Sequence, residues 1–403
     1  MIGVLSGAAA MVALAGIGQA IAGLLSVRRF AGDPGPAPSQ ARDRCTPVTL
    51  LKPLHGDEPL LEQALASVCA QDYPHFQIVF GVQSHADPAI AVVRRLQQRF
   101  AGRDIVLVID PTQHGRNRKI SNLINMLPSA RHDLLLIADS DLHCRPDYLE
   151  RVVAAFASPE IGLVTTLYAG LAANASLAAR LGASAINHGF LPGALLSRDL
   201  ARQDCLGATM ALRRETLAAA GGLHALVDHL ADDNVLGELV RRRGLRIRIA
   251  ATVPATTVPE SRLAPLFTHE LRWSRTILSL VPVQFALSSI QFPLFWSALA
   301  IALSGAAWWS LLLFAATWLA RARVAGAIDA ALGLVAAGHA SPAPALLLPL
   351  RDALSMAVLL ASYASDKVEW RGQMMHTRPV EPALAEPPHP ITEVSQPQGT
   401  LTS

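Results

Sequence analysis

The chain has 403 residues, of which 51% are hydrophobic and 16% charged, and its formal net charge is +3. This composition is too apolar for a purely soluble enzyme, whereas the charged middle section excludes a bundle made only of membrane helices. The near balance of charge gives no indication of nucleic-acid binding. One soluble domain of about 200–250 residues with a few membrane helices fits the length.

The first 27 residues predict a membrane helix. Residues 2–27 carry no charge and are long enough to cross a hydrocarbon layer of about 30 Å. The basic pair Arg28-Arg29 follows the apolar run, whereas a signal peptide would carry its basic residues in front. We therefore expect residues 1–29 to form an anchor, with the following domain in the cytoplasm.

Two further apolar blocks predict a C-terminal membrane region over residues 281–370. The block from Phe292 to Ala320 has no charge and predicts one span. The block 343–364 is interrupted by Arg351-Asp352, which should face protein, water or each other. Residues 324–338 are open between an interfacial segment and a fourth span. The polar, proline-rich tail over residues 376–403 is predicted to be disordered.

The middle section, residues 46–280, is predicted to fold as one α/β domain. Apolar runs of strand length alternate with helical patterns, which predicts a mostly parallel sheet covered on both faces. Such sheets bind ligands beyond the carboxyl ends of their strands. The predicted strands cover 47–54, 76–83, 104–110, 133–139 and 161–167, and the helices between them cover 59–70, 88–100, 119–127 and 146–157.

The four cysteines fit a reducing compartment. They are widely spaced and form no CxxC pair, which argues against a disulfide scaffold or a zinc knuckle. We expect all four to be small apolar fillers of the interior. They are Cys45, Cys69, Cys144 and Cys205.

Acidic residues follow two of the predicted strands. Asp139 and Asp141 end the fourth strand, and two carboxylates at this spacing can converge on one Mg²⁺ or Mn²⁺ ion. The alternative is a turn that caps the next helix. Asp87 follows the second strand and could contact the base or ribose of a nucleotide, with a helix cap as its alternative.

Further along the chain lie a basic loop, an acidic pair and an Arg-Trp pair. The loop 115–119 joins a glycine turn, three cations and a helix start, which suits a diphosphate, although a solvated loop would look alike. Asp233 could act as a general base or belong to an acidic first helical turn. Arg272 and Trp273 could hold a phosphate and line an acceptor pocket, or anchor a helix at the bilayer surface.

The order of these motifs resembles the ceramide glucosyltransferase-like family of membrane glycosyltransferases, family 21 within the group with the GT-A fold. The resemblance extends from about residue 47 to 373. It implies a GT-A domain that carries three scattered aspartates and a closing Arg-Trp motif. The matching segments are LLKPLHG (50–56), DYP (72–74), VQSHADPAI (82–90), GRNRKISNL (115–123), ADSD (138–141), PDYL (146–149), AGGL (220–223), ADDN (231–234), ELRW (270–273) and WRG (370–372).

The resemblance assigns a role to each predicted site residue. It implies nucleotide contact for Asp87, metal–diphosphate contact for Asp139 and base catalysis for Asp233. Lys119 matches a lysine in the donor-nucleotide region, and Arg272 with Trp273 falls on the closing pair.

Two positions depart from the family pattern. His269 stands where Gln or Arg is expected, so the group that it contacts is open. The contact of His188 is open as well. Asp141 supplies a second carboxylate where ceramide enzymes often lack one, which favours a metal-dependent enzyme.

The resemblance implies an inverting enzyme that moves a sugar from a UDP-sugar to a membrane lipid. Composition, the short tail and the DSD variant favour the bacterial hopanoid-biosynthesis branch, which adds N-acetylglucosamine from UDP-N-acetylglucosamine to bacteriohopanetetrol at the inner membrane. A ceramide glucosyltransferase, using UDP-glucose, is the main alternative. A processive polysaccharide synthase would need more spans, and a non-catalytic scaffold would be expected to lack the aspartates. Serine-hydrolase, Walker A and HExxH motifs are absent from the sequence.

Overall fold

The computed structural model describes residues 2–33, 35, 46–336, 338, 342, 345–365, 367–370 and 373–376. Cys45, the last two residues of the WRG segment and the tail from residue 377 lie outside these ranges. The three described cysteines are buried and unpaired, as expected for interior fillers.

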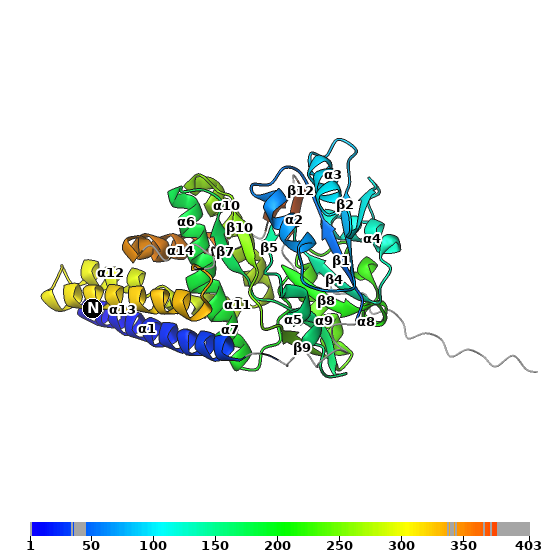
Figure 1. The fold of residues 1–403 in the computed structure, drawn as a ribbon. Helices are drawn as coiled ribbons and strands as arrows, with labels where there is room; N and C mark the ends of the chain where they lie inside the picture. Colours follow the sequence, from blue (N-terminus) through cyan, green and yellow to red (C-terminus); the bar gives the residue numbers. More distant parts are fainter. Residues whose placement is uncertain are drawn as a thin grey trace, which may run out of the picture.

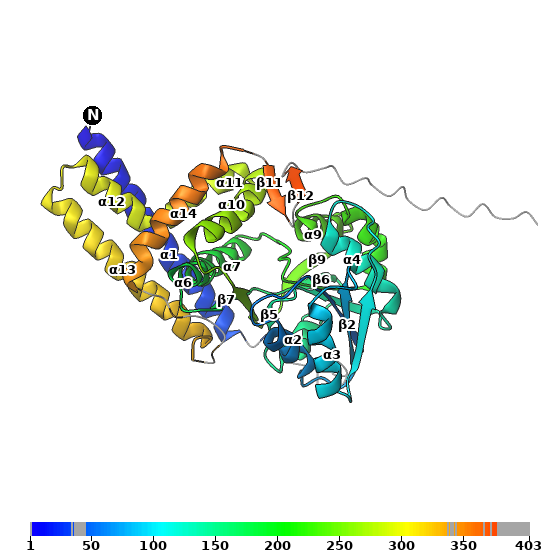
Figure 2. The ribbon, with the colours of Figure 1, turned by 90° about the horizontal axis from the view of Figure 1, so that it is seen from above.

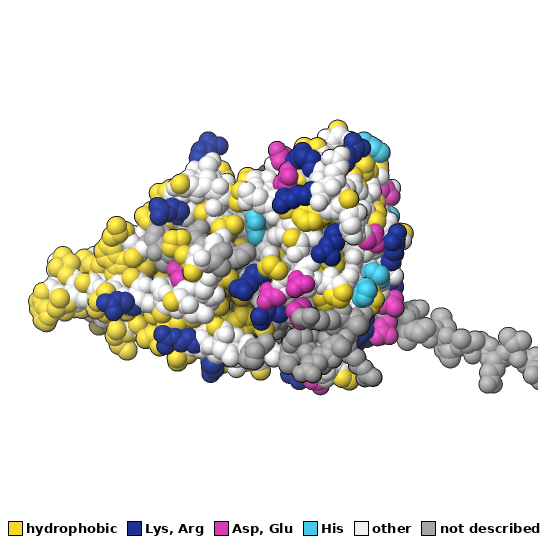
Figure 3. Space-filling view, in the orientation of Figure 1, with side chains coloured by type: hydrophobic (Ala, Val, Ile, Leu, Met, Phe, Trp, Pro, Cys, Tyr) yellow, Lys and Arg dark blue, Asp and Glu magenta, His cyan; other side chains and the backbone are white. Residues whose placement is uncertain are grey.

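The molecule consists of a helical part and an α/β part that lie side by side (Figures 1 and 2). The N-terminal helix α1 packs against the C-terminal helices α12 and α13, although they are far apart in sequence. Apolar side chains gather over the free end of this helical part (Figure 3). The helices are α1 (Ile2–Gly32), α10 (Leu263–Leu280), α11 (Pro282–Leu287), η5 (Ser288–Gln291), α12 (Pro293–Leu303), α13 (Trp308–Leu332), η6 (Ala345–Leu347) and α14 (Leu348–Ser362).

A seven-stranded sheet forms the centre of the α/β part. All its strands are parallel except β8, which runs antiparallel to both neighbours. The predicted mostly parallel sheet is therefore confirmed, and the five predicted strands are present. In sheet order the strands are β3 (Asp104–Ile109), β2 (Phe76–Val82), β1 (Val48–Pro53), β4 (Leu134–Ala138), β8 (Thr209–Arg213), β6 (Ile161–Thr165) and β9 (Arg246–Ile249).

Helices cover both faces of this sheet, as the continuous apolar strands predict. Side chains alternate along a strand, so Leu50 packs into one hydrophobic cluster and Leu51 into the other. One cluster includes α2 (Leu61–Cys69), α3 (Ala89–Arg99) and α5 (Tyr148–Ala154). The other includes α4 (Arg118–Met126), η2 (Leu127–Ser129), α8 (Arg214–Ala219), η4 (Leu223–Leu226) and α9 (Asp232–Arg242).

A small second sheet lies between the α/β core and the membrane helices. Its strands are β5 (Leu142–His143), β10 (Ala255–Val258) and β7 (Ala169–Ala172), none of which the sequence pattern predicts. The chain then enters α6 (Leu177–Ala185), the π-helical turn η3 (Ile186–Phe190) and α7 (Leu191–Asp199). A further hairpin pairs β11 (Lys367–Trp370) with β12 (Gln373–His376).

In the part of the chain that the structure describes, three helices are long and apolar enough to cross a membrane: Ile2–Gly32, Trp308–Leu332 and Ala345–Ser362. The first and last agree with the predicted spans. The predicted single span from Phe292 to Ala320 is wrong, because a turn over residues 304–307 divides it into α12 and α13. Gly305 and Ala306 adopt left-handed backbone conformations there, with φ of 65° and 59°, which an α-helix does not contain.

The stretch 324–338, which the sequence left open, continues α13 as far as Leu332. Gly333 ends that helix with φ of 62°. The segment Pro282–Gln291 and α12 bend by 70° at their junction, and together they could make a fourth span.

The charged pair Arg351-Asp352 is buried among protein, as expected. Arg351 is 3% exposed and donates two hydrogen bonds of 2.7 Å to Glu270 on α10. Asp352 is 1% exposed, accepts a hydrogen bond from the Leu294 amide and lies 3.8 Å from Arg321. Each member of the pair therefore has its own partner on another helix.

Arg351→Met should destabilise the protein strongly, because Glu270 would lose its cation in a partly buried position. We expect the free energy of unfolding to fall by about 3–5 kcal/mol, and most of it to return in the double variant Glu270→Leu/Arg351→Met. Thermal unfolding of the full-length protein in detergent measures both. Arg29→Met is the control, because Arg29 pairs with Asp199 while 66% exposed and should change stability by at most about 1 kcal/mol. Equal effects of the two single variants would contradict the prediction.

Candidate active site

The carboxyl ends of β1, β2 and β4 meet at one edge of the sheet, because these three neighbouring strands are parallel. Asp139 is the first residue after β4, and its backbone amide donates to the Ala208 carbonyl at 3.1 Å. The Asp139 carbonyl accepts a hydrogen bond of 2.6 Å from the Lys52 ammonium. Lys52 is fully buried, and this burial lowers its pKa.

The ammonium group of Lys119 lies between Asp139, at the end of β4, and Asp232, at the start of α9. Lys119 Nζ lies 2.7 Å from Asp139 Oδ1 and 3.8 Å from Asp232 Oδ2. Burial opposes the charge of Lys119, but Asp139 and Asp232 outweigh it and raise the pKa of the lysine. Lys119 is therefore a fixed positive charge at the rim of the sheet. Since Asp139 is the more exposed partner, at 38%, its carboxylate is open to a ligand.

Asp232 and Asp233 form the acidic first turn of helix α9, which was the alternative to a general base at this position. Burial, followed by repulsion from Asp232, raises the pKa of Asp233 to about 6. The Gly207 backbone lies against this carboxylate: a Cβ atom at Gly207 would stand 2.8 Å from Asp233 Oδ2. Asp232 Oδ2 is buried and accepts no hydrogen bond within the described part of the chain.

Asp141, two residues after Asp139, contacts the small sheet. Its side chain accepts a hydrogen bond from the Thr256 hydroxyl on β10. Burial and the neighbouring charge of Asp139 raise the pKa of Asp141 to about 6. The two aspartates of the DSD segment are therefore close enough to repel each other.

Asp87 is 8% exposed, and hydrogen bonds hold its carboxylate in place. It accepts from the amides of Gly56 and of Ala89, the first residue of α3. The loop that contains Gly56 also reaches the rim, because Glu58 accepts a hydrogen bond of 2.7 Å from Ser140. Asp87 therefore shapes the loop beside the rim and caps a helix, which was the alternative for this residue.

Arg272 and Trp273 lie on α10 at the side of the membrane helices. Trp273 is 39% exposed and meets the His269 ring edge-on at 4.5 Å. His269 Nδ1 lies 2.5 Å from Glu260 Oε1, and the charge of Arg272 also acts on Glu260. The contact of His269, which the sequence left open, is therefore the carboxylate of Glu260. His188 is likewise packed internally, 2.8 Å from Asp329 and 2% exposed.

Two side chains that the sequence did not single out join these parts. Asn117 is fully buried and bonds the His229 carbonyl at 2.8 Å and Asp232 at 3.3 Å, so it fastens the basic loop to the start of α9. Tyr168 stacks on Phe190 at 4.7 Å, and burial with the charges of nearby aspartates raises its pKa. Asn117 was visible as a cap before a helix, whereas nothing in the local pattern marked Tyr168.

The basic loop keeps donor capacity for an anion. The Nε atom of Arg118 is buried and finds no hydrogen-bond partner among the residues described. It lies at the first position of α4, next to Lys119, where helix geometry favours negative charge.

Metal-binding capacity at the rim rests on carboxylates alone. Over the described ranges, no three His, Cys, Asp or Glu side chains come together as a metal site. Asp139 and Asp141 offer the oxygen ligands that hard divalent cations prefer. The two carboxylates repel each other, and a cation bound between them would relieve this repulsion. These two residues fit a cation whose remaining ligands come from a bound substrate and water.

Comparison with known proteins gives a match over most of the chain. The model of glycosyl transferase family 21 matches residues 8–382. Ceramide glucosyltransferase 1 of Caenorhabditis elegans is 23% identical over 246 residues, which is 60% of this chain and 52% of that protein. Ceramide glucosyltransferase of Komagataella phaffii is 33% identical over 112 residues, 27% of this chain and 22% of that protein. The matches thus span about half of the former relative's length and less of the latter's.

A solved structure shares the fold. Mannosyltransferase PcManGT from Pyrobaculum calidifontis, in complex with GDP-Man and Mn²⁺, aligns with a TM-score of 0.51 and 21% identity. The alignment covers 89% of this chain and 99% of that one. The expected GT-A-like fold, with its mostly parallel sheet and apolar helices at both ends, is thereby confirmed.

Proposed function

Because the chain belongs to glycosyl transferase family 21, we propose that it transfers a sugar from a UDP-sugar to the hydroxyl group of a membrane lipid, with inversion at the anomeric carbon. The observation that carries this proposal is the cluster of Lys119, Asp139 and the Asp232-Asp233 pair at the carboxyl edge of the sheet. This cluster supplies a cation for a diphosphate and a carboxylate for a proton.

The donor would bind along the strand ends. Lys119 and the unpartnered Nε of Arg118 would hold the diphosphate, and Asp87 would shape the nucleotide end of the site. Asp139 and Asp141 would hold Mg²⁺ or Mn²⁺, which would neutralise charge on the departing UDP. As the phosphates approach, the ion pair between Lys119 and Asp139 would weaken and the ammonium would turn towards the diphosphate.

Asp233 would act as the general base. A carboxylate with a pKa near 6 is ionised at neutral pH yet basic enough to accept a proton from an attacking hydroxyl. The acceptor oxygen would attack the anomeric carbon opposite the diphosphate, the bond to UDP would break, and the proton would end on Asp233. Since a single displacement suffices, no covalent sugar–enzyme intermediate is needed.

The acceptor would enter from the side of α10. The apolar helices α1, α13 and α14 would place this face at the bilayer, with Trp273 exposed beside it and Arg272 on the same helix. Arg28-Arg29 at the end of α1 favours the cytoplasmic side of a bacterial inner membrane.

Two lipid classes are candidates for the acceptor. The names of the curated relatives favour ceramide, with glucose as the sugar. The bacterial composition and the second carboxylate, Asp141, favour a hopanoid polyol, with N-acetylglucosamine as the sugar. Membranes containing the full-length protein, supplied with each acceptor and with UDP-glucose or UDP-N-acetylglucosamine, separate the two by mass spectrometry of the lipid extract. A polymeric product would favour a polysaccharide synthase, and no UDP release with any donor would contradict the proposal.

Asp233→Asn should lower kcat by about 10²–10⁴-fold, because an amide cannot accept the proton. In the wild type, kcat/KM should fall as the pH drops below about 6, where Asp233 becomes protonated and unable to act as a base, and where Asp141 loses the charge with which it would hold the metal. Steady-state rates from pH 5 to 8, with UDP binding measured separately, test both statements. Near-normal turnover by Asp233→Asn with normal UDP binding would disprove the assignment.

Gly207→Ala should also impair turnover, because the new methyl group would stand 2.8 Å from Asp233 Oδ2 and displace that carboxylate. We expect kcat to drop at least about tenfold, since small misplacements of a catalytic group are costly. Gly102→Ala is the matched control, because nothing lies within 4 Å of a Cβ atom built there. If both variants turned over like the wild type, Asp233 would not need its present position.

A further inference from the structure

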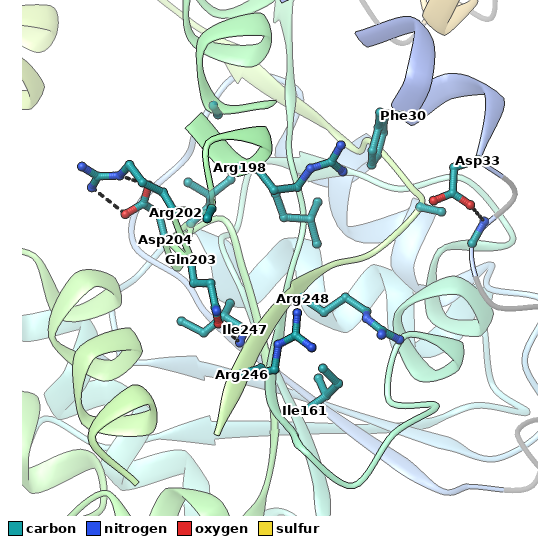
Figure 4. A pocket seen from close by; sticks show the side chains of 16 residues that line it. Phe30, Asp33, Ile161, Arg198, Arg202, Gln203, Asp204, Arg246, Ile247 and Arg248 are labelled. Atoms are coloured by element: carbon teal, nitrogen blue, oxygen red, sulfur yellow. Dashed lines mark hydrogen bonds and ion pairs between the residues drawn. The ribbon is translucent and has the colours of Figure 1, made fainter. Parts of the chain in front are cut away.

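A cavity of about 600 Å³ lies at the junction between the membrane helices and the α/β part, apart from the aspartates of the proposed active site. Its walls come from the last turn of α1 and the residues after it, from α7 and the following loop, and from strand β9 (Figure 4). Nothing in the proposed transfer reaction uses these residues.

The cavity lies where α1 leaves its apolar surroundings. Leu24, Val27 and Phe30 of α1 pack in one hydrophobic cluster with residues of α7 and the end of α13. Phe30 belongs to both this cluster and the cavity wall. The basic pair Arg28-Arg29 occupies the same turn of the helix, as is typical of a boundary between lipid and water.

Arginines dominate the charge of the cavity wall. Among the described residues, four arginines line it against two aspartates, Asp33 and Asp204. Arg202 and Asp204 form two bonds of 2.9 and 2.7 Å and so neutralise each other. Arg198 lies over the Phe30 ring, 5.6 Å from its centre, and contacts Asp199 at 3.0 Å.

Of the two arginines on β9, Arg248 contributes the less compensated charge. Arg246 and Arg248 stand two residues apart and so extend from the same face of this edge strand (Figure 4). Arg246 pairs with Glu160 at 3.0 Å, in an exposed contact. The Arg248 guanidinium donates to the Ala155 carbonyl at 3.2 Å and meets no carboxylate within the described ranges.

We propose that this cavity binds a phosphate group, with Arg248 as its main contact. A planar guanidinium donates two parallel hydrogen bonds to phosphate oxygens, and such pockets at the ends of membrane helices suit anionic lipid head groups. The headgroup of an anionic phospholipid and a free phosphate share this chemistry. The position beside Phe30 at the end of α1 favours the lipid, whose acyl chains would continue along the helix surface. This site is independent of the proposed sugar transfer.

Binding of phosphatidylglycerol to the full-length protein in detergent, measured by native mass spectrometry and by thermal stabilisation, tests the proposal. Phosphatidylcholine and inorganic phosphate are the two other arms. We expect Arg248→Gln to weaken phosphatidylglycerol binding about fivefold and Arg246→Gln/Arg248→Gln to weaken it further. Arg131→Gln is the matched control, because it removes one cation near the opposite edge of the sheet, where Arg131 pairs with Asp104.

Each outcome has a defined meaning. Binding of phosphatidylglycerol that inorganic phosphate does not displace supports a lipid source, and binding of inorganic phosphate alone supports a soluble one. Two results would overturn the proposal. One is an equal loss of phosphatidylglycerol binding in Arg248→Gln and Arg131→Gln, and the other is that neither phosphatidylglycerol nor inorganic phosphate binds. If Arg248→Gln fails to fold, Arg248→Lys keeps the charge but loses the paired hydrogen bonds, and weaker binding by this variant supports the same site.

Discussion

The ion pair between Lys119 and Asp139 is the contact on which the proposed active site depends. It joins the helix after the third strand to the end of the fourth strand, and it draws Asp232 into the same field. Without the ammonium of Lys119, the carboxylates of Asp139, Asp232 and Asp233 would repel one another at the rim of the sheet. The lysine therefore permits an acidic cluster that solvent alone could not stabilise.

The close spacing of the aspartates also raises the pKa of individual carboxylates. Asp141 and Asp233 both have a pKa near 6, and in both cases burial comes first and a neighbouring aspartate second. They face different surroundings, however, because Asp141 is held by a threonine hydroxyl, whereas Asp233 rests against a glycine backbone. In the proposed reaction, the end of β4 would thus supply a metal ligand and the start of α9 a base.

The sequence predicted the α/β core well, because buried parallel strands appear as continuous apolar runs between helices. It missed the antiparallel strand β8, the edge strand β9, in which charged and apolar residues alternate, and the small sheet, whose strands have two to four residues and no distinct pattern. It also joined α12 to α13, since composition alone does not reveal the left-handed turn at Gly305 and Ala306. Asp139, Asp233 and Lys119 were identifiable by their places after strands and before helices, whereas Tyr168 and Lys52 acquire meaning only through folding.

The contact between Arg351 and Glu270 has a mechanical consequence. Glu270 lies only two residues before Arg272 on the same rigid helix, and its partner belongs to a helix long enough to cross the bilayer. Any tilting of α14 must either carry α10 along or separate a buried pair of charges. In a bilayer, the thickness and tension of the surrounding lipid would therefore act on the orientation of Trp273 through the contact between α14 and α10.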